Sequence, residues 1–249
     1  MNTRELKQWL LNGHLTFLQH LSVDCVIFGF HDNQLKVLLL KWNDGGWCVP
    51  GGFVKKTETL EDSASRVLKE RTGLEHTFMR QFHTFSELNR DKGKKPFKIP
   101  GTSKSWYMDR FISVGFWALV EYSKVTPNPD WLSEECSWWD IHEVPKLIND
   151  HNFIVTKALE SLRLSLNDHP VGYDLLPEKF TMRELLELYE TILDTRIDRR
   201  NFRKKILSLD ILVQLKAQKP SVSSKPSILY RFDKKKYKEA TRKGLMTGF

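Results

Sequence analysis

Residues 51–74 contain the feature that most constrains how this 249-residue chain can fold. The pair Gly51-Gly52 permits a turn from a strand into a loop that other residues resist. Thr57 or Thr59 can then cap a helix, and Gly73 can end it. Between these signals, apolar residues recur at helical spacing, namely Leu60, Ala64, Val67 and Leu68. The segment therefore predicts a strand, a loop and an amphipathic helix over residues 59–72.

The same segment resembles the Nudix box, whose pattern is G-x5-E-x7-R-E-U-x-E-E-x-G-U, where U is aliphatic. An ordinary amphipathic helix after a Gly-Gly turn would explain any two of the matches, but not all of them in register. Two of the three helix glutamates are replaced, by Val67 and Arg71. The resemblance implies an α+β fold with a Nudix-like α/β/α sandwich and a mixed sheet. The matching residues are Gly52, Glu58, Arg66, Leu68, Glu70, Gly73 and Leu74.

The missing carboxylates change the expected chemistry. In the family, the three glutamates share one helix face and hold a divalent metal ion against a diphosphate. Mg2+ needs several hard oxygen ligands, and here that face keeps only Glu70. The guanidinium of Arg71 is always protonated, so it repels a cation but can attract an anionic ligand. The chain is therefore expected not to be an enzyme, with no metal site and no cofactor. Glu58 and Arg66 are expected to form an internal ion pair that joins the loop to the helix.

Charge is divided unevenly along the chain. Residues 1–169 contain 21 Lys+Arg and 21 Asp+Glu, whereas residues 170–249 contain 18 basic and 10 acidic residues, which is the entire net charge of +8. A chain of this length exceeds one typical domain. We therefore predict an effector domain over residues 1–168 and a basic domain over residues 169–249. A basic domain indicates a polyanionic partner, either nucleic acid or an anionic membrane surface.

The rest of the first domain contains strand patterns and one long polar segment. Residues 87–110 predict a surface loop, which is either a functional insertion or a solvated segment. Three widely spaced cysteines and the absence of an apolar run near about 20 residues predict a cytoplasmic protein without a membrane partner. Strands are expected over residues 23–30, 35–41, 78–85, 111–121 and 136–141, with a helix from Pro145 to about Leu166.

The basic domain has the pattern of a winged helix-turn-helix. Thr181 to Glu184 form a capping box before one helix, and Asp198 can cap a second helix over residues 199–207. Strands over 212–219 and 227–232 enclose a polar loop that can act as a wing. The second helix of such a domain enters the major groove, although a solvated basic face is the simpler alternative. The residues expected to contact DNA are Arg199, Arg200, Asn201, Arg203, Lys204, Lys205, Ser224 and Lys225. The basic stretch 234–238 either adds backbone contacts or is solvated.

The combination of a degenerate Nudix box with this basic domain resembles the Nudix-related transcriptional regulators. That family includes an ADP-ribose-sensing repressor of NAD metabolism and an arabinose regulator. The resemblance implies a homodimer that binds a palindromic DNA operator and responds to a small-molecule effector. Residues 24–30 are similar to those of the sugar-responsive branch, but the insertion 91–110 departs from both branches. The sequence therefore leaves two alternatives for the identity of the effector, a sugar or an ADP-ribose-like ligand. The resemblance assigns ligand binding to Asp24, Lys41, Trp47, Glu70, Arg71 and Arg90.

Two other interpretations stay open from the sequence. The first is an active nucleoside-diphosphate hydrolase that takes metal ligands from Glu61, Asp62 or Glu87 and binds RNA through the basic domain. The second is an adaptor that does not bind DNA.

Overall fold

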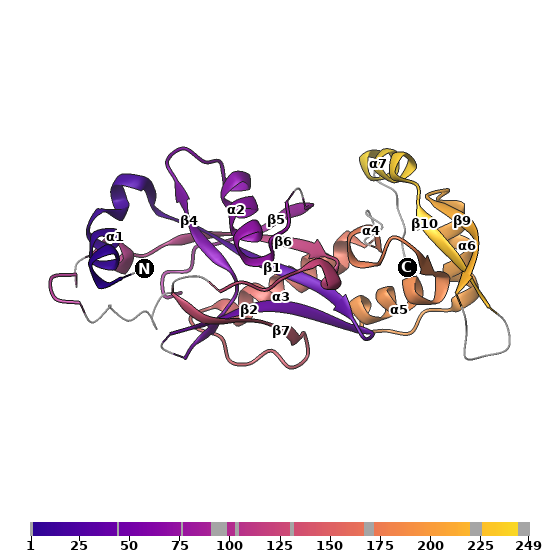
Figure 1. Ribbon diagram of the computed structural model, residues 1–249, viewed down its shortest axis with the longest axis horizontal. Coiled ribbons are helices and arrows are strands. Elements are labelled where there is room, and N and C mark those ends of the chain that lie inside the picture. Colours follow the sequence, from indigo (N-terminus) through magenta and orange to yellow (C-terminus); the bar gives the residue numbers. More distant parts are fainter. Residues whose placement is uncertain are drawn as a thin grey trace. The chain divides into compact units, whose positions relative to one another are not determined.

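The structure of the protein, a computed structural model, divides into two compact units (Figure 1). The first unit contains Met1–Phe28, Val37–Ala118 and Lys124–Ala158, and the second contains Gly29–Lys36, Leu119–Ser123 and Leu159–Phe249. The tip of one hairpin, residues 29–36, is thus grouped with the C-terminal residues. The expected domain boundary at residues 168 and 169 lies outside the described residues. The structure describes residues 2–43, 45–75, 77–90, 99–102, 105–129, 132–166, 172–219 and 226–243.

A seven-stranded sheet forms the centre of the first unit, with the order β3-β2-β1-β6-β5 and with β4 and β7 pairing to β1 and β2. Its central strands are continuous apolar runs because both faces are covered. Residues 23–28 are buried, as are residues 37–40. The strands are β1 (Phe17–His31), β2 (Gln34–Trp42), β3 (Trp47–Cys48), β4 (Gly51–Lys55), β5 (Met79–Phe85), β6 (Ile112–Val120) and β7 (Ser133–Asp140). The helices are α1 (Thr3–Thr16), α2 (Leu60–Thr72) and α3 (His151–Ser165), with 3-10 turns η1 (Trp106–Met108) and η2 (Tyr122–Lys124).

The Gly-Gly pair predicted as a turn lies instead in strand β4. Gly51 pairs with Asp24 of β1, and Gly52 pairs with Val23. A Cβ on Gly51 would lie 2.7 Å from Asp24 Oδ1, and a Cβ on Gly52 would lie 2.9 Å from Val67 Cγ2. The two glycines are therefore required for close approach of β4 to β1 and to α2, not for an unusual backbone conformation.

The N-terminal helix α1 was not expected from the sequence, and it packs against part of the 87–110 insertion. The indole Nε1 of Trp106 donates to the backbone oxygen of Trp9 at 3.1 Å, and the two rings lie 5.1 Å apart. Phe53 of β4 joins them with its ring 4.7 Å from that of Trp106. Trp106 and Tyr107 are almost fully buried. This end of the insertion is thus part of a packed aromatic cluster, which excludes the purely solvated interpretation for it.

The second unit contains the helix-turn-helix and wing strands close to the expected bounds. Its elements are α4 (Gly172–Leu175), β8 (Phe180–Thr181), α5 (Met182–Leu193), α6 (Arg199–Ser208), β9 (Leu212–Lys219), β10 (Ser227–Phe232) and α7 (Lys234–Lys243). Thr181 caps α5 in the predicted capping box with Glu184, and Asp198 caps α6. The strands form a sheet with the order β8-β10-β9. Tyr189 of α5 and Phe202 of α6 meet edge to face at 5.2 Å and join the two helices.

No helix among the described residues is long and apolar enough to span a bilayer.

Gly13 of α1 gives a test of the contact between this helix and the insertion. An alanine normally stabilises a helix relative to glycine by about 0.5–1 kcal/mol. Here its Cβ would lie 2.3 Å from Trp106 Nε1, and the buried indole cannot move without breaking its hydrogen bond to Trp9. Gly13→Ala is therefore expected to lower the free energy of unfolding by about 1–3 kcal/mol, measured by urea denaturation.

A double-mutant cycle controls this prediction. In a Trp106→Ala background, Gly13→Ala should be neutral or stabilising, because the clashing ring is absent. Destabilisation of equal size in both backgrounds would show that Gly13 serves some other purpose.

Candidate functional site

An ion pair joins the loop after β4 to helix α2, as predicted. Arg66 Nε donates to Glu58 Oε1 at 2.8 Å, and Arg66 Nη2 donates to Glu58 Oε2 and to the backbone oxygen of Phe53, both at 2.9 Å. Ser63 Oγ donates to Glu58 Oε2 at 2.7 Å. The Arg66 guanidinium holds the pKa of Glu58 well below its usual range, and Glu58 raises the pKa of Arg66. The loop and the helix are thus fixed to each other by this ion pair.

The helix face that should carry carboxylates is occupied by internal contacts. Val67 is buried against Gly52, and Arg71 is 6% exposed. Arg71 Nη1 approaches the backbone oxygen of Asn128 at 3.4 Å, and Asn128 Nδ2 donates to the backbone oxygen of Glu70 at 3.1 Å. Glu70 itself is exposed and lies 3.5 Å from Arg71 Nη2. Arg71 therefore connects the end of α2 to the segment that precedes β7.

The alternative metal ligands do not assemble into a site in the described part of the chain, where no group of three or more His, Cys, Asp or Glu residues could hold a metal ion. Asp62 already accepts from the backbone N–H of Thr59, the N-cap residue of α2, as part of a capping box.

Arg90 and Asp24, both expected to bind ligand, meet in a buried ionic network. Arg90 Nε donates to Asp150 Oδ2 at 2.9 Å, and its Nη2 lies 3.4 Å from Asp24 Oδ2. Ser113 Oγ donates to Asp24 Oδ2 at 2.5 Å, and Arg90 Nη1 donates to the backbone oxygen of Phe111 at 3.3 Å. One guanidinium thus joins β1, the residues before β6, and the residue preceding α3. The carboxylates of Asp24 and Asp150 balance the positive charge of the buried Arg90 side chain.

Lys41 and Trp47 are partners in the antiparallel pairing of β2 with β3. The Lys41 ammonium lies 2.7 Å from Glu134 Oε1, which raises the pKa of the lysine. The Trp47 ring meets Trp139 edge to face at 5.0 Å. The six expected ligand residues therefore fall into three pairs, Asp24 with Arg90, Glu70 with Arg71, and Lys41 with Trp47. Which of them contact a ligand stays a prediction.

Sequence reasoning missed the residues that complete these pairs. Asp150, Ser113 and Glu134 belong to no recognisable motif, and only the fold brings them to their partners. A buried arginine requires carboxylates, but its partners here are 60 and 66 residues away in sequence. No local pattern could have identified them.

The outward face of α6 is basic, as the sequence predicts. Arg199, Arg200, Asn201, Arg203 and Lys204 are exposed, and Lys205 is half-buried. The opposite face packs into the core through the buried side chains of Phe202 and Ile206. Ser224 and Lys225 of the expected wing lie outside the described residues, so their contact with DNA stays a prediction.

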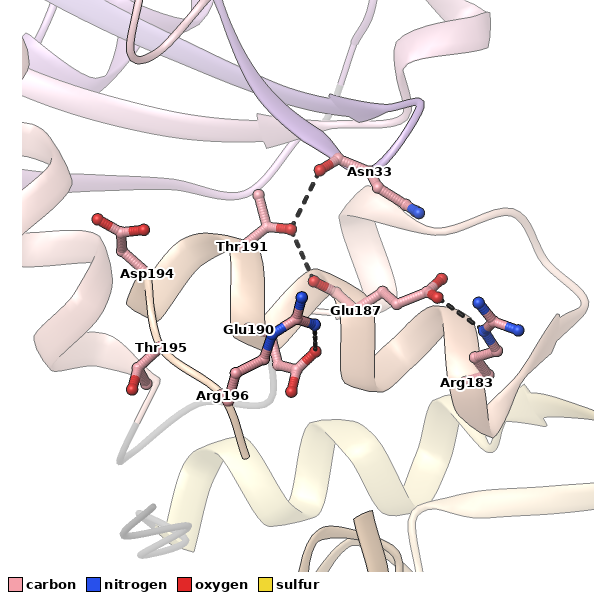
Figure 2. Close-up of a pocket in the computed structure, with 8 residues that line it drawn as sticks. All are labelled: Asn33, Arg183, Glu187, Glu190, Thr191, Asp194, Thr195 and Arg196. Atoms are coloured by element: carbon pink, nitrogen blue, oxygen red, sulfur yellow. Dashed lines mark hydrogen bonds and ion pairs between the residues drawn. The ribbon is translucent and has the colours of Figure 1, made fainter. Parts of the chain in front are cut away.

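A polar groove of about 650 Å3 lies within the second unit, along α5 and the turn that leads to α6 (Figure 2). Four of its charged side chains form ion pairs: Glu187 with Arg183 at 2.7 Å, and Glu190 with Arg196 at 3.2 Å. Thr191 Oγ1 lies 3.2 Å from the backbone oxygen of Asn33, at the tip of the β1–β2 hairpin. The lining residues are Asn33, Arg183, Glu187, Glu190, Thr191, Asp194, Thr195 and Arg196.

Comparison with known protein families matches residues 18–159 to the NUDIX domain. The chain belongs to the Nudix family. Residues 172–232 match the NrtR DNA-binding winged helix domain, so the chain joins a Nudix domain to a DNA-binding module. The α+β organisation expected from the sequence, a Nudix-like sheet with helices followed by a winged helix, is confirmed. With both modules in one chain, the protein is a Nudix-related transcriptional regulator, as the resemblance implied.

The chain is also similar to individual proteins. The chain is 26% identical over 220 residues to the ADPR responsive transcriptional repressor NtrR of Acinetobacter baylyi, covering 85% of this chain and 81% of the relative. It is 28% identical over 156 residues to an ADP-ribose pyrophosphatase of Methanocaldococcus jannaschii, and this match covers 61% of this chain and 78% of the relative. The crystal structure of Shewanella oneidensis NrtR complexed with a 27mer DNA superposes with a TM-score of 0.71 at 27% identity, covering 88% of this chain and 96% of that chain.

The ion pair of the Nudix box predicts a pH-dependent stability. The pKa of Glu58 in the folded state lies below its value of about 4.3 in the unfolded state. The ionised Glu58 therefore contributes its full stabilisation to the folded state above about pH 4.3, and this contribution is lost as the pH falls toward the folded-state pKa. Glu58→Gln is expected to lower the free energy of unfolding by about 1.5–3 kcal/mol at pH 7. Urea unfolding should be measured between pH 7 and pH 3. The difference in the free energy of unfolding between the variant and the wild type should become smaller below about pH 4.

Glu61→Gln is the matched control, since Glu61 is an exposed carboxylate on the same helix. Its effect should be small at pH 7. A Glu58→Gln effect that stayed constant down to pH 3 would contradict the assignment of this stabilisation to the ionised carboxylate.

Proposed function

We propose that this protein is a DNA-binding transcriptional regulator in which the Nudix domain binds ADP-ribose or a related nucleotide-sugar and thereby controls binding to an operator. The observation that carries the proposal is the outward face of α6, where Arg199, Arg200, Asn201, Arg203 and Lys204 are exposed together. Arginine can bond guanine bidentately and asparagine can bond adenine in the major groove. These residues lie on the second helix of a helix-turn-helix, which is the helix that reads bases.

The choice of effector rests on the relatives. The similarity to the ADPR responsive repressor covers 85% of this chain, more than one domain alone could provide. In this chain Val67 and Arg71 take the places of two metal-binding glutamates, and both side chains are engaged inside the protein. We therefore assign recognition rather than hydrolysis to the domain.

Lys41 and Trp47 are the residues we assign to direct effector contact. Both are only partly buried and they pair across β2 and β3. An ammonium can attract a diphosphate, and an indole ring offers a face for a base or a sugar. Asp24 and Arg90, whose charges are balanced within the buried network, fix the position of β1 instead.

The β1–β2 hairpin provides a route from effector to DNA-binding helices. Asp24 and Lys41 lie on its two strands, while its tip contacts α5 through Asn33 and Thr191. The tip is itself well defined, because His31 stacks on Tyr122 with ring centroids 4.3 Å apart. A change in strand position at the effector site would thus reach the helix that supports α6.

The protein is proposed to act in the cytoplasm as a homodimer on a palindromic operator. One α6 helix reads one half-site, and a two-fold symmetric dimer presents two such helices to a two-fold symmetric sequence.

The decisive experiment measures DNA binding and hydrolysis in parallel. Fluorescence anisotropy with DNA from upstream of the protein's own gene should give specific binding that ADP-ribose alters. Arg200→Ala with Arg203→Ala is expected to weaken this binding by about 30-fold or more, since each base contact contributes about 1–3 kcal/mol. Arg4→Ala with Arg110→Ala removes the same two charges from the first unit and should leave binding nearly unchanged.

Two results would overturn the proposal. Mg2+-dependent release of products from ADP-ribose at enzymatic rates would make the protein a hydrolase. Unchanged DNA affinity in the α6 variant would remove the assigned recognition helix and favour an adaptor.

The hairpin contact makes a separate prediction about the response to effector. Thr191→Val combined with His31→Ala should reduce the effect of ADP-ribose on DNA affinity by about 0.5–2 kcal/mol, which is about 2- to 30-fold. The affinity for ADP-ribose and the affinity for DNA without effector should each stay within about twofold of the wild type. Anisotropy titrations with and without ADP-ribose measure all three quantities.

Thr156→Val is the matched control for the threonine. Thr156 Oγ1 donates to the backbone oxygen four residues earlier in α3, as Thr191 Oγ1 does in α5, but among the described residues no hydrogen bond joins it to the hairpin. An unchanged effector response in the hairpin variant would rule out this route.

A further inference from the structure

Helix α7 is a basic element beyond the match to the winged-helix family, which ends at residue 232. Its inward side packs through Tyr237, whose ring stacks on Tyr173 at 4.7 Å and meets Phe232 edge to face at 5.5 Å. Ala240, one turn later, is buried. This packing turns Lys234, Lys235 and Lys238 to the outside, where all three are exposed. Positions 234, 235 and 238 share one face of a helix because they are three and four residues apart.

The sheet places the start of α7 beside the end of α6. At the end of β10, Phe232 pairs with Leu212, the first residue of β9, and β9 follows α6 closely. The backbone N–H of Asp233 donates to the backbone oxygen of Ile211 at 2.9 Å. Lys236 Nζ lies 2.6 Å from Asp210 Oδ2, two residues after α6 ends. The basic face of α7 therefore belongs to the same compact unit as the recognition helix.

The residues at the start of α7 have distinct electrostatic roles. Asp233 accepts hydrogen bonds from the backbone N–H groups of Lys235 and Lys236 and caps the helix. Lys236 is neutralised by Asp210, so it positions the helix. The three exposed lysines face Glu239 as the acidic residue on their own helix. The face thus keeps a net positive charge next to a helix that binds DNA.

We propose that Lys234, Lys235 and Lys238 contact backbone phosphates of duplex DNA beside the base pairs read by α6. This inference rests on the DNA-binding function proposed above. Lysine binds phosphate as a point charge without reading bases, so the contact supplies affinity that is independent of sequence. Duplex DNA is the occupant because α7 packs on the residues of the winged-helix module, through Tyr237 and Phe232, and the positive charge of its exposed face is complementary to phosphate.

The test uses the full-length variant Lys234→Gln, Lys235→Gln, Lys238→Gln. Its affinity should fall about tenfold at 0.1 M salt for both operator and unrelated DNA, with the ratio between them unchanged. The slope of log affinity against log salt should become shallower by about 0.9 for each phosphate that the variant no longer neutralises. Replacement of the same three lysines by arginine should restore both the affinity and the slope, because the charges return.

A second triple variant separates local binding of phosphate from overall charge. Lys7→Gln, Lys56→Gln, Lys146→Gln removes the same charge from exposed positions in the first unit, and it should leave the salt slope as in the wild type. The α7 proposal fails if the two triple variants have equal affinities and slopes while the Arg200→Ala, Arg203→Ala variant still binds operator more weakly than the wild type. Wild-type DNA affinity in all of the variants, or absence of DNA binding by the wild type, would instead overturn the proposed function itself.

Discussion

The ion pair between Glu58 and Arg66 is the interaction that fixes the loop of the Nudix box to its helix. It holds the end of β4, through the backbone oxygen of Phe53, against helix α2. In the Nudix pattern this pair uses different residues from the three helix glutamates that bind metal, although Arg66 is adjacent to the first of those positions. The positions of Val67 and Arg71 could therefore change without releasing the helix. Val67 contributes to the core, and Arg71 secures the segment before β7. The metal face has become part of the internal packing.

The presence of Val67 and Arg71 in place of two glutamates changes the electrostatic energy of helix α2. Three carboxylates on one helix face repel one another unless a cation is bound, and such a helix depends on its metal for part of its stability. An aliphatic residue and a paired arginine remove that dependence. Removal of two carboxylates therefore lowers the electrostatic repulsion that a bound cation would otherwise have to offset.

Local signals in the sequence were sufficient for most of the elements. The capping boxes at Thr59 and Thr181, the left-handed glycine at residue 73 and the periodicity of α5 and α6 each depend on residues close in sequence. Their predicted bounds agree with the structure to within a residue or two. Two of the helices that were missed, α1 and α7, are stabilised by tertiary contacts. Trp9 of α1 packs on Trp106, nearly 100 residues away, and Tyr237 of α7 packs on Tyr173. A highly charged segment such as residues 234–243 forms a helix when an aromatic neighbour covers its one apolar side.

The candidate site was predicted less completely for the same reason. Asp24 and Arg90 were selected as ligand contacts, but only the fold reveals that Asp150 and Ser113 satisfy them. The consequence is mechanical. A strand whose buried aspartate is held by an arginine cannot shift alone, because the network would lose charged hydrogen bonds that are costly to break. Any displacement of β1 must therefore be shared along the strand. The last residues of that strand, Gly29–His31, are grouped with the winged-helix residues. A displacement of β1 by a bound ligand would therefore also reach the hairpin turn, whose Asn33 contacts Thr191 of α5.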